Sequence, residues 1–241
     1  MQVCLLSHTP DPEKAVARAI RLCYSPRSIL ELDSSLAGKD LSVLLRKVIS
    51  LGHHSVLEHA SFTFGIEGVS RVMTHQLVRH RLASYSQQSQ RYVEFKDSLE
   101  VVVPESIRRD RGFYRRYLEH CREAFSIYRD MCEGGIPAED ARYLFPSAAQ
   151  TKIIVTMNAR ELRHFFRIRC CERAQWEIRG VAERMVGLVR DVAPSLFADS
   201  GPSCIGGPCP EGDMTCGRIK EVKARYRALK TAPSPKAQDP V

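Results

Sequence analysis

The segment between Glu67 and Glu94 contains no acidic residue, although it carries four arginines and two histidines. These six side chains are Arg71, His75, Arg79, His80, Arg81 and Arg91. Solvated protein surfaces usually mix both signs of charge, so a stretch without counter-charge indicates that an anion from outside the segment balances it. This pattern favours a fold that presents these side chains to an anionic ligand. The alternative is a solvated basic loop.

The seven residues between Arg81 and Ser89 favour the ligand. They include only two aliphatic side chains, and the full set is Leu82, Ala83, Ser84, Tyr85, Ser86, Gln87 and Gln88. Burial in a core does not explain such a loop. Guanidinium groups bind phosphate oxygens in pairs, and Ser and Gln side chains offer the donors and acceptors that read the edge of a base.

The length of 241 residues and the hydrophobic content of 44% allow one substantial core. The nine cysteines could form disulfides, but residues 1–10 lack the basic region, apolar stretch and cleavage site of a secretory signal. No run of about 18 apolar residues predicts a membrane span. We therefore expect a cytoplasmic protein with reduced thiols and no membrane partner.

The net charge of +8 suits either nucleic acid or small phosphorylated ligands. Nucleic-acid-binding proteins usually spread lysine and arginine over one face. In this chain no lysine occurs between Lys47 and Lys96, and arginine gathers in short polar segments and at helix ends. The pattern favours pockets. A basic nucleic-acid-binding protein, with residues 71–91 as a phosphate track and the C-terminal tail as an arm, is the competing hypothesis.

Hydrophobic periodicity predicts helices mixed irregularly with a few strands. Strands are predicted at residues 2–7, 62–66 and 151–157, and also at 92–95 and 101–103. Helices are predicted from residue 12 and at 41–52, 71–79, 106–132, 137–143, 158–169 and 174–192. This order indicates an α+β (mixed α/β) fold, a single domain at residues 1–200 whose central antiparallel sheet is flanked by helices. A mobile basic tail is expected at 201–241, with a short helix around 220–229.

Three polar side chains are expected to cap the helices that follow them, namely Asp11, Ser70 and Asn158. Asn158 also stands three residues before Glu161, which is the spacing of a capping box. Together with Arg160, the start of this last helix presents an amide, a guanidinium and backbone N–H groups, a combination that suits an anion.

The helix at 158–169 ends its apolar stripe on a charge. The stripe consists of Leu162, Phe165, Phe166 and Arg169, at positions i, i+3, i+4 and i+7. An unpaired buried charge is costly. Arg169 therefore either pairs with an acid such as Glu172 or Glu177, or faces a ligand pocket at the helix end.

Three histidines and one glutamate lie within seven residues, at His53, His54, Glu58 and His59. Their spacing lacks the HExxH pattern of zinc hydrolases, so hydrogen bonding to a ligand or plain surface exposure is favoured. A metal-dependent hydrolase built on these histidines is a second alternative, but no metal site is predicted.

The cysteines give no clear site either. Cys204, Cys209 and Cys216 are three thiols at spacings of five and seven, without a fourth ligand. Cys170 and Cys171 follow Arg169, which could lower the pKa of a nucleophilic thiol. Cysteines after an apolar helix are more often packing residues, and we favour that role.

The sequence resembles one known family. Arg79-His80-Arg81, seven further residues and Ser89, followed by Arg91-Tyr92, resemble the signature of the flavin-dependent thymidylate synthases. Supporting blocks occur in the same order as in that family. They are Gly52-His53, Ser55, Glu58-His59, Phe62-Thr63-Phe64, Asn158-Ala159-Arg160, Arg169 and Ala174-Gln175-Trp176-Glu177-Ile178, so the resemblance spans about residues 40–190.

The resemblance implies an enzyme that methylates dUMP to dTMP. Methylenetetrahydrofolate would provide the carbon, and FAD reduced by NADPH would provide the hydride. Family members are homotetramers with shared active sites, and their fold is built around an antiparallel sheet. The implied partners are therefore dUMP and folate as small-molecule substrates, without nucleic acid or membrane.

The resemblance also implies residue roles. FAD binding would fall to His53, Ser55, Glu58, Arg79, His80, Arg81, Asn158, Arg160 and His164. Substrate binding would fall to Gln76, Arg79, Gln87, Gln88, Ser89, Gln90, Arg91, Arg142 and Arg169. Arg169 would activate the uracil by stabilising developing charge, without a cysteine nucleophile. The sequence departs from the family pattern at Gln87, Gln90 and His164, which replace an acid, a glycine and an asparagine that are common there.

Overall fold

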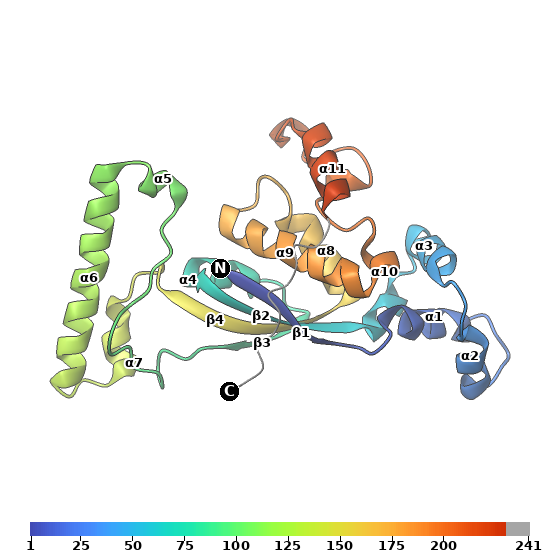
Figure 1. The fold of residues 1–241 in the computed structure, drawn as a ribbon, viewed down its shortest axis with the longest axis horizontal. Helices are drawn as coiled ribbons and strands as arrows, with labels where there is room; N and C mark the ends of the chain where they lie inside the picture. The colour runs from blue at the N-terminus through green and yellow to red at the C-terminus, as the bar shows by residue number, and fades with distance from the viewer. Residues whose placement is uncertain (230–241) are drawn as a thin grey trace. The chain divides into compact units, whose positions relative to one another are not determined.

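The computed structural model describes residues 1–229, which form helices and one four-stranded sheet (Figure 1). The strands are β1 (Gln2–His8), β2 (Ser61–Ser70), β3 (Ala83–Gln87) and β4 (Gln150–Asn158). They are antiparallel and lie in the order β1-β2-β4-β3. The Thr63 and Thr156 hydroxyls, 2.9 Å apart, link β2 to β4. The predicted α+β class with an antiparallel sheet is confirmed.

The described chain divides into two compact units, and each strand has residues in both. Unit 1 contains Met1–Gln2, Ile66–Arg79 and Tyr85–Ile154. Unit 2 contains Val3–Gly65, His80–Ser84 and the described residues from Val155 onward.

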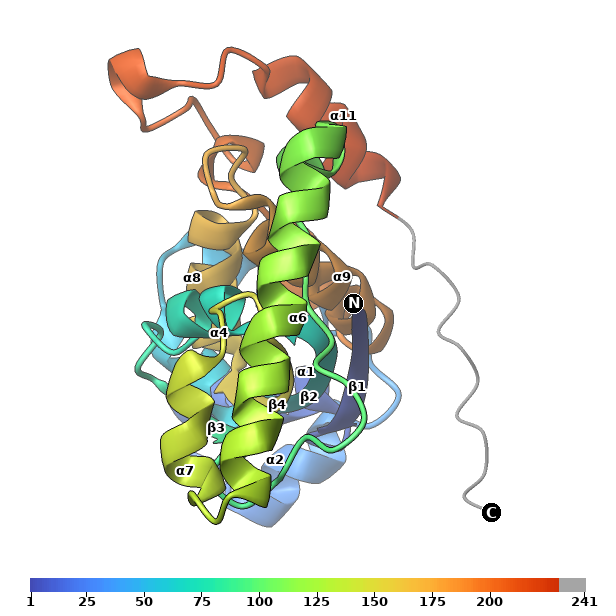
Figure 2. The same cartoon turned by 90° about the vertical axis from the view of Figure 1, so that its left-hand side faces the viewer.

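Unit 1 is organised by the long helix α6 (Arg111–Glu133). The Asp110 carboxylate caps α6 by accepting a hydrogen bond of 2.9 Å from the Phe113 N–H. The buried Tyr128 ring of α6 packs 4.4 Å from the ring of Phe145. The other helices are α4 (Arg71–Leu77), α5 (Glu105–Arg108), α7 (Ala138–Ala141) and the 3-10 helix η2 (Arg142–Leu144), and α7 lies beside α6 (Figure 2).

Unit 2 contains the larger apolar core. Phe62 of β2 is fully buried, as are Phe166 and Phe197, and the Phe197 ring meets Phe62 edge to face at 5.4 Å. The helices are α1 (Pro12–Leu22), α2 (Ile29–Leu36), α3 (Ser42–Ser50), α8 (Ala159–Arg169), α9 (Trp176–Val192), α10 (Pro194–Phe197) and α11 (Ile219–Ala228). Three 3-10 helices join them, η1 (His54–His59), η3 (Ser203–Ile205) and η4 (Gly212–Met214).

Most predicted elements are confirmed, but three differ. Residues 92–95 form no strand, and Val101 makes one isolated bridge to Ala149. Residues 83–87, expected in a loop, form β3 at the sheet edge, with Ser84 and Ser86 exposed. An edge strand tolerates polar side chains, which explains why hydrophobic periodicity missed it.

Two helix starts also differ from expectation. Asp11 has a left-handed backbone with φ 44° and makes no capping hydrogen bond, so the predicted cap is wrong. Pro12 opens α1 without an N–H that needs a partner. The unpredicted α2 starts with a capping box between Ser28 and Glu31, which are three residues apart, as this motif requires.

The expected short helix in the tail is confirmed as α11. Residues 230–241 of that tail lie outside the described residues. Within residues 1–229, no helix has both the length and the apolar character needed to cross a membrane.

Gly201 is predicted to be essential for packing α11. Its φ is +150°, and an added Cβ would lie 2.7 Å from Cδ1 of the buried Tyr226. Gly201→Ala should therefore lower the free energy of unfolding by about 1–3 kcal/mol. Gly206→Ala is the matched control, because its Cβ would meet nothing within 4 Å. Urea unfolding measures both, and equal stability of the two variants would contradict this packing.

Candidate active site

The buried His80 contacts two charged or acidic side chains of unit 2, Arg169 and Glu161. Arg169, at the end of α8, donates a hydrogen bond of 3.0 Å from Nε to His80 Nε2. On the other side of the ring, His80 Nδ1 lies 3.2 Å from the Glu161 carboxylate. Since a guanidinium can only donate, Nε2 is the acceptor and the ring proton sits on Nδ1, where it is donated to Glu161.

Electrostatics keep His80 neutral. Burial lowers the pKa of His80 to about 4, and the charges of Arg169 and His164 act in the same direction. Burial also raises the pKa of Glu161 and lowers that of Arg169. Near neutral pH, the contact between His80 and Glu161 is therefore a hydrogen bond from an uncharged imidazole and not an ion pair.

The start of α8 differs from the expected capping box. Asn158 Oδ1 accepts a hydrogen bond of 2.9 Å from the Glu161 N–H, so the cap is confirmed. The Glu161 side chain instead turns towards His80, which is 81 residues away in sequence. The spacing between Asn158 and Glu161 predicted a local capping role for Glu161 and did not predict its contact with His80.

Other predicted cofactor residues lie around α8 and η1, which pack together. Arg160 pairs with Glu58 at 2.5 Å, and the Ala159 N–H donates to the Ala60 carbonyl at 2.8 Å. The His164 ring lies edge to face with His80 at 6.0 Å. His53 and Ser55 are exposed at the start of η1.

Except for Arg169, the predicted substrate residues belong to unit 1. Arg91 forms an ion pair with the Glu139 carboxylate, while Arg142 Nε donates to the Glu139 carbonyl at 2.9 Å. Burial lowers the pKa of Arg71, and the charge of Arg142 lowers it further. Arg71 is thus a cation close to Arg142 that the predicted set omitted, although it lies in the segment without acids.

The polar residues after Arg81 make contacts within the protein. Gln87 Nε2 donates to the hydroxyls of Thr74 at 3.1 Å and Thr151 at 3.3 Å. Ser89 Oγ accepts from the N–H groups of Arg91 and Tyr92, which shapes a turn. Gln90 is buried. Gln88 is half-buried, and its backbone N–H donates to the Lys152 carbonyl. Before Arg81 in the sequence, the Gln76 side chain of α4 donates to the Val72 carbonyl.

Arg79 and Arg81 are both exposed. Within residues 1–229, neither side chain forms an ion pair with an acid. Glu172, one of the acids considered for Arg169, is instead contacted by Arg179, Arg218 and Arg225.

Two of the cavities in the described chain are lined by arginines or include a predicted substrate residue. One of about 460 Å³ in unit 2 is lined by Arg46, Arg163 and Arg167, and one of about 430 Å³ in unit 1 includes Gln88. Neither is lined by Arg79, Arg81 or Arg169.

Within residues 1–229, the thiols and histidines form no metal-binding group. In the described part of the chain, no group of three or more His, Cys, Asp or Glu is placed to hold a metal ion, which includes the histidines at 53, 54 and 59. Cys171 joins Cys204, Cys209 and Cys216 around a cavity of about 20 Å³. Burial raises the pKa of Cys170 to about 12, which disfavours a nucleophilic thiolate there.

The lowered pKa of His80 predicts a pH dependence of stability. The unfolded chain binds a proton at His80 below about pH 6.5, whereas the folded chain binds it only below about pH 4. Stability is therefore lost as the pH falls through this window, by up to about 3 kcal/mol. Urea unfolding of His80→Gln should show this loss reduced, because glutamine does not titrate. Identical pH profiles for variant and wild type would contradict the assignment.

Comparisons with known proteins agree with the resemblance. A family model described as thymidylate synthase complementing protein matches residues 4–195. The chain is 58% identical to a flavin-dependent thymidylate synthase of Geobacter sulfurreducens, over 95% of this chain and 99% of the relative. Relatives of the same name from Clostridium tetani and Pyrococcus furiosus are 48% and 43% identical, over 94% and 95% of this chain and 97% and 98% of the relatives. By these matches over most of its length, the chain is an enzyme of the thymidylate synthase complementing protein family.

Proposed function

We propose that the enzyme converts dUMP to dTMP by reductive methylation, with methylenetetrahydrofolate as carbon donor and FAD, reduced by NADPH, as hydride source. The shared name of its relatives supports the reaction class and the flavin. The observation that carries the proposal is the hydrogen bond from Arg169 to the neutral His80. A guanidinium oriented by its Nε hydrogen bond carries a fixed positive charge, which can stabilise negative charge developing on uracil.

The donors of unit 2 fit a flavin nucleotide. Arg81 is exposed and forms no ion pair with an acid in the described chain, so its charge suits a pyrophosphate oxygen. The exposed Ser55 hydroxyl and His53 imidazole add donors at η1, next to the N-terminal turn of α8. When bound, FAD would supply the hydride chemistry. We assign its binding to His53, Ser55, Glu58, Arg79, His80, Arg81, Asn158, Arg160 and His164.

The cations of unit 1 suit the phosphate of dUMP. Arg71 and Arg142 lie close enough for repulsion to lower the pKa of Arg71, and a phosphate dianion would relieve that repulsion. We therefore add Arg71 to the substrate residues. The remaining members are Gln76, Arg79, Gln87, Gln88, Ser89, Gln90, Arg91, Arg142 and Arg169.

Exposed apolar side chains support a homotetramer with shared sites. Leu82, Tyr92 and Tyr143 are 73%, 78% and 86% exposed, and all are close in sequence to assigned residues. A neighbouring subunit would cover them. Light scattering should then give the mass of four 27.3 kDa chains, and a monomer mass would contradict the shared site. The nine unpaired cysteines support a reducing, cytoplasmic location.

Arg169→Ala tests the proposed chemistry. We expect purified wild type to bind FAD and to release the C5 proton of dUMP when NADPH and methylenetetrahydrofolate are supplied. The variant should lose about 100-fold or more in kcat, because the charge that stabilises the uracil is removed, while its visible flavin spectrum persists, because the residues assigned to FAD are unchanged. Arg167→Ala, an exposed arginine on the same helix, is the control and should remain active. Near-normal turnover of Arg169→Ala would remove Arg169 from the mechanism.

A further inference from the structure

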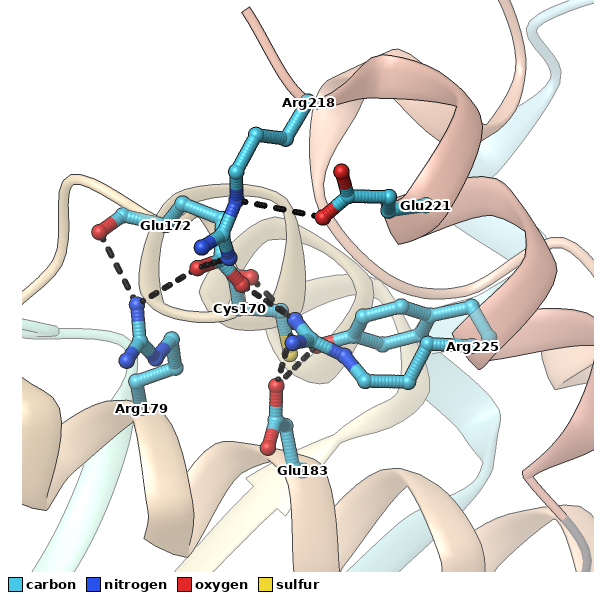
Figure 3. A network of polar contacts seen from close by, with 8 residues as sticks. Cys170, Glu172, Arg179, Glu183, Arg218, Glu221 and Arg225 are labelled. Carbon is cyan, nitrogen blue, oxygen red and sulfur yellow. Dashed lines mark hydrogen bonds and ion pairs between the residues drawn. The ribbon is translucent and has the colours of Figure 1, made fainter. Parts of the chain in front are cut away.

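The turn that follows Arg169 is held by the C-terminal part of the chain. Residues 170–175 connect α8 to α9, and the side chains of α11 reach this turn (Figure 3). The Tyr226 hydroxyl, whose single proton has two acceptors within reach, lies 3.3 Å from the Cys170 carbonyl and 3.1 Å from the Glu183 carboxylate. The contact with Cys170 fixes the backbone one residue beyond Arg169.

Glu172, on the same turn, is surrounded by three guanidiniums. Arg179 of α9 lies 3.2 Å from its carboxylate, and Arg218 and Arg225 of the C-terminal segment also pair with it (Figure 3). Burial alone would raise the pKa of Glu172, but the hydrogen bond from Arg225 and the three positive charges lower it overall. The carboxylate therefore stays ionised, and its side chain is only 9% exposed. Hydrogen bonds between charged groups in such surroundings are among the stronger ones in proteins.

The C-terminal helix α11 packs firmly against the rest of unit 2. Val222 and Tyr226 are buried, and Arg190 of α9 donates to the Tyr226 carbonyl at 2.7 Å. Arg225 also pairs with Glu183 of α9 at 3.0 Å. The apolar contacts and the Arg190 bond already dock α11, so the contacts to residues 170 and 172 place an additional constraint on the turn.

We propose that α11 is a positioning element for Arg169, in which Arg218, Arg225 and Tyr226 act through Glu172 and the Cys170 carbonyl. The inference rests on the proposed role of Arg169. A helix end without such anchors frays readily. A guanidinium on a frayed end spends less time in the productive geometry, and a displacement of about 1 Å can lower a rate by about 100-fold.

The test compares two arginines on one helix in the full-length holoenzyme. Arg225→Gln removes the pairs to Glu172 and Glu183, whereas Arg227→Gln changes an exposed arginine that makes no ion pair within residues 1–229. We expect Arg225→Gln to lower kcat about tenfold, with flavin content and the KM for dUMP changed less than about threefold. Arg227→Gln should match wild type, and Arg225→Lys should recover part of kcat because it restores a charge.

Two further measurements separate positioning from stability. Tyr226→Phe keeps the packed ring and removes only the hydroxyl, so it should fold and lower kcat in the same direction. Hydrogen exchange of the amides at residues 170–175 should speed up by about tenfold in Arg225→Gln and remain unchanged in Arg227→Gln.

A lower Tm with unchanged kcat per bound flavin would show that α11 only stabilises the fold, and would overturn the inference while leaving the proposed function intact. Unchanged exchange at 170–175 in Arg225→Gln would overturn it as well. Absence of turnover in wild type would overturn the proposed function, and this inference with it.

Discussion

The candidate active site depends on one hydrogen bond, from Arg169 to an uncharged His80. A cation at the end of an apolar stripe needs an acceptor, and a carboxylate in that position would neutralise it. A neutral imidazole accepts the Nε–H bond without adding a negative charge beside the guanidinium. Burial against Phe165, whose ring lies 4.9 Å from His80, disfavours protonation of the imidazole. Glu161 holds the required tautomer by accepting from Nδ1.

The acids near the predicted site pair with some of its arginines and not with others. Glu58 pairs with Arg160 and Glu139 with Arg91, so some of the assigned cations have partners within the protein. Arg79 and Arg81 have no such acid within residues 1–229. Arg79 and Arg81, which belong to the segment without acids, are therefore not neutralised by an acid within residues 1–229. Phosphate groups of a nucleotide or cofactor would balance them.

Local sequence patterns predicted much of the secondary structure, because helix periodicity and helix capping depend on residues that are neighbours in the sequence. Periodicity located α6, α8 and α9, and Ser70 and Asn158 cap their helices as expected. The apolar stripe of α8 also identified Arg169 as unusual. The polar strand β3 was missed because an edge strand needs no hydrophobic alternation.

Long-range partners could not be predicted in the same way. Glu161 has the spacing of a capping-box residue, yet its carboxylate reaches His80 across 81 positions. The pairs of Glu172 with Arg218 and Arg225 span 46 and 53 positions. Nothing in the composition of a Gly- and Pro-containing tail shows that it returns to the turn after Arg169. Such contacts are set by the packing of α8, α9 and α11, which only coordinates reveal.

The most direct test of the central claim is the protonation state of His80. Nitrogen NMR of histidine-labelled protein at pH 7, assigned by comparison with His80→Gln, distinguishes the two neutral tautomers from the imidazolium. The account predicts a neutral ring with its proton on Nδ1 and Nε2 as a hydrogen-bond acceptor. A proton on Nε2, in either a neutral or a charged ring, would contradict it.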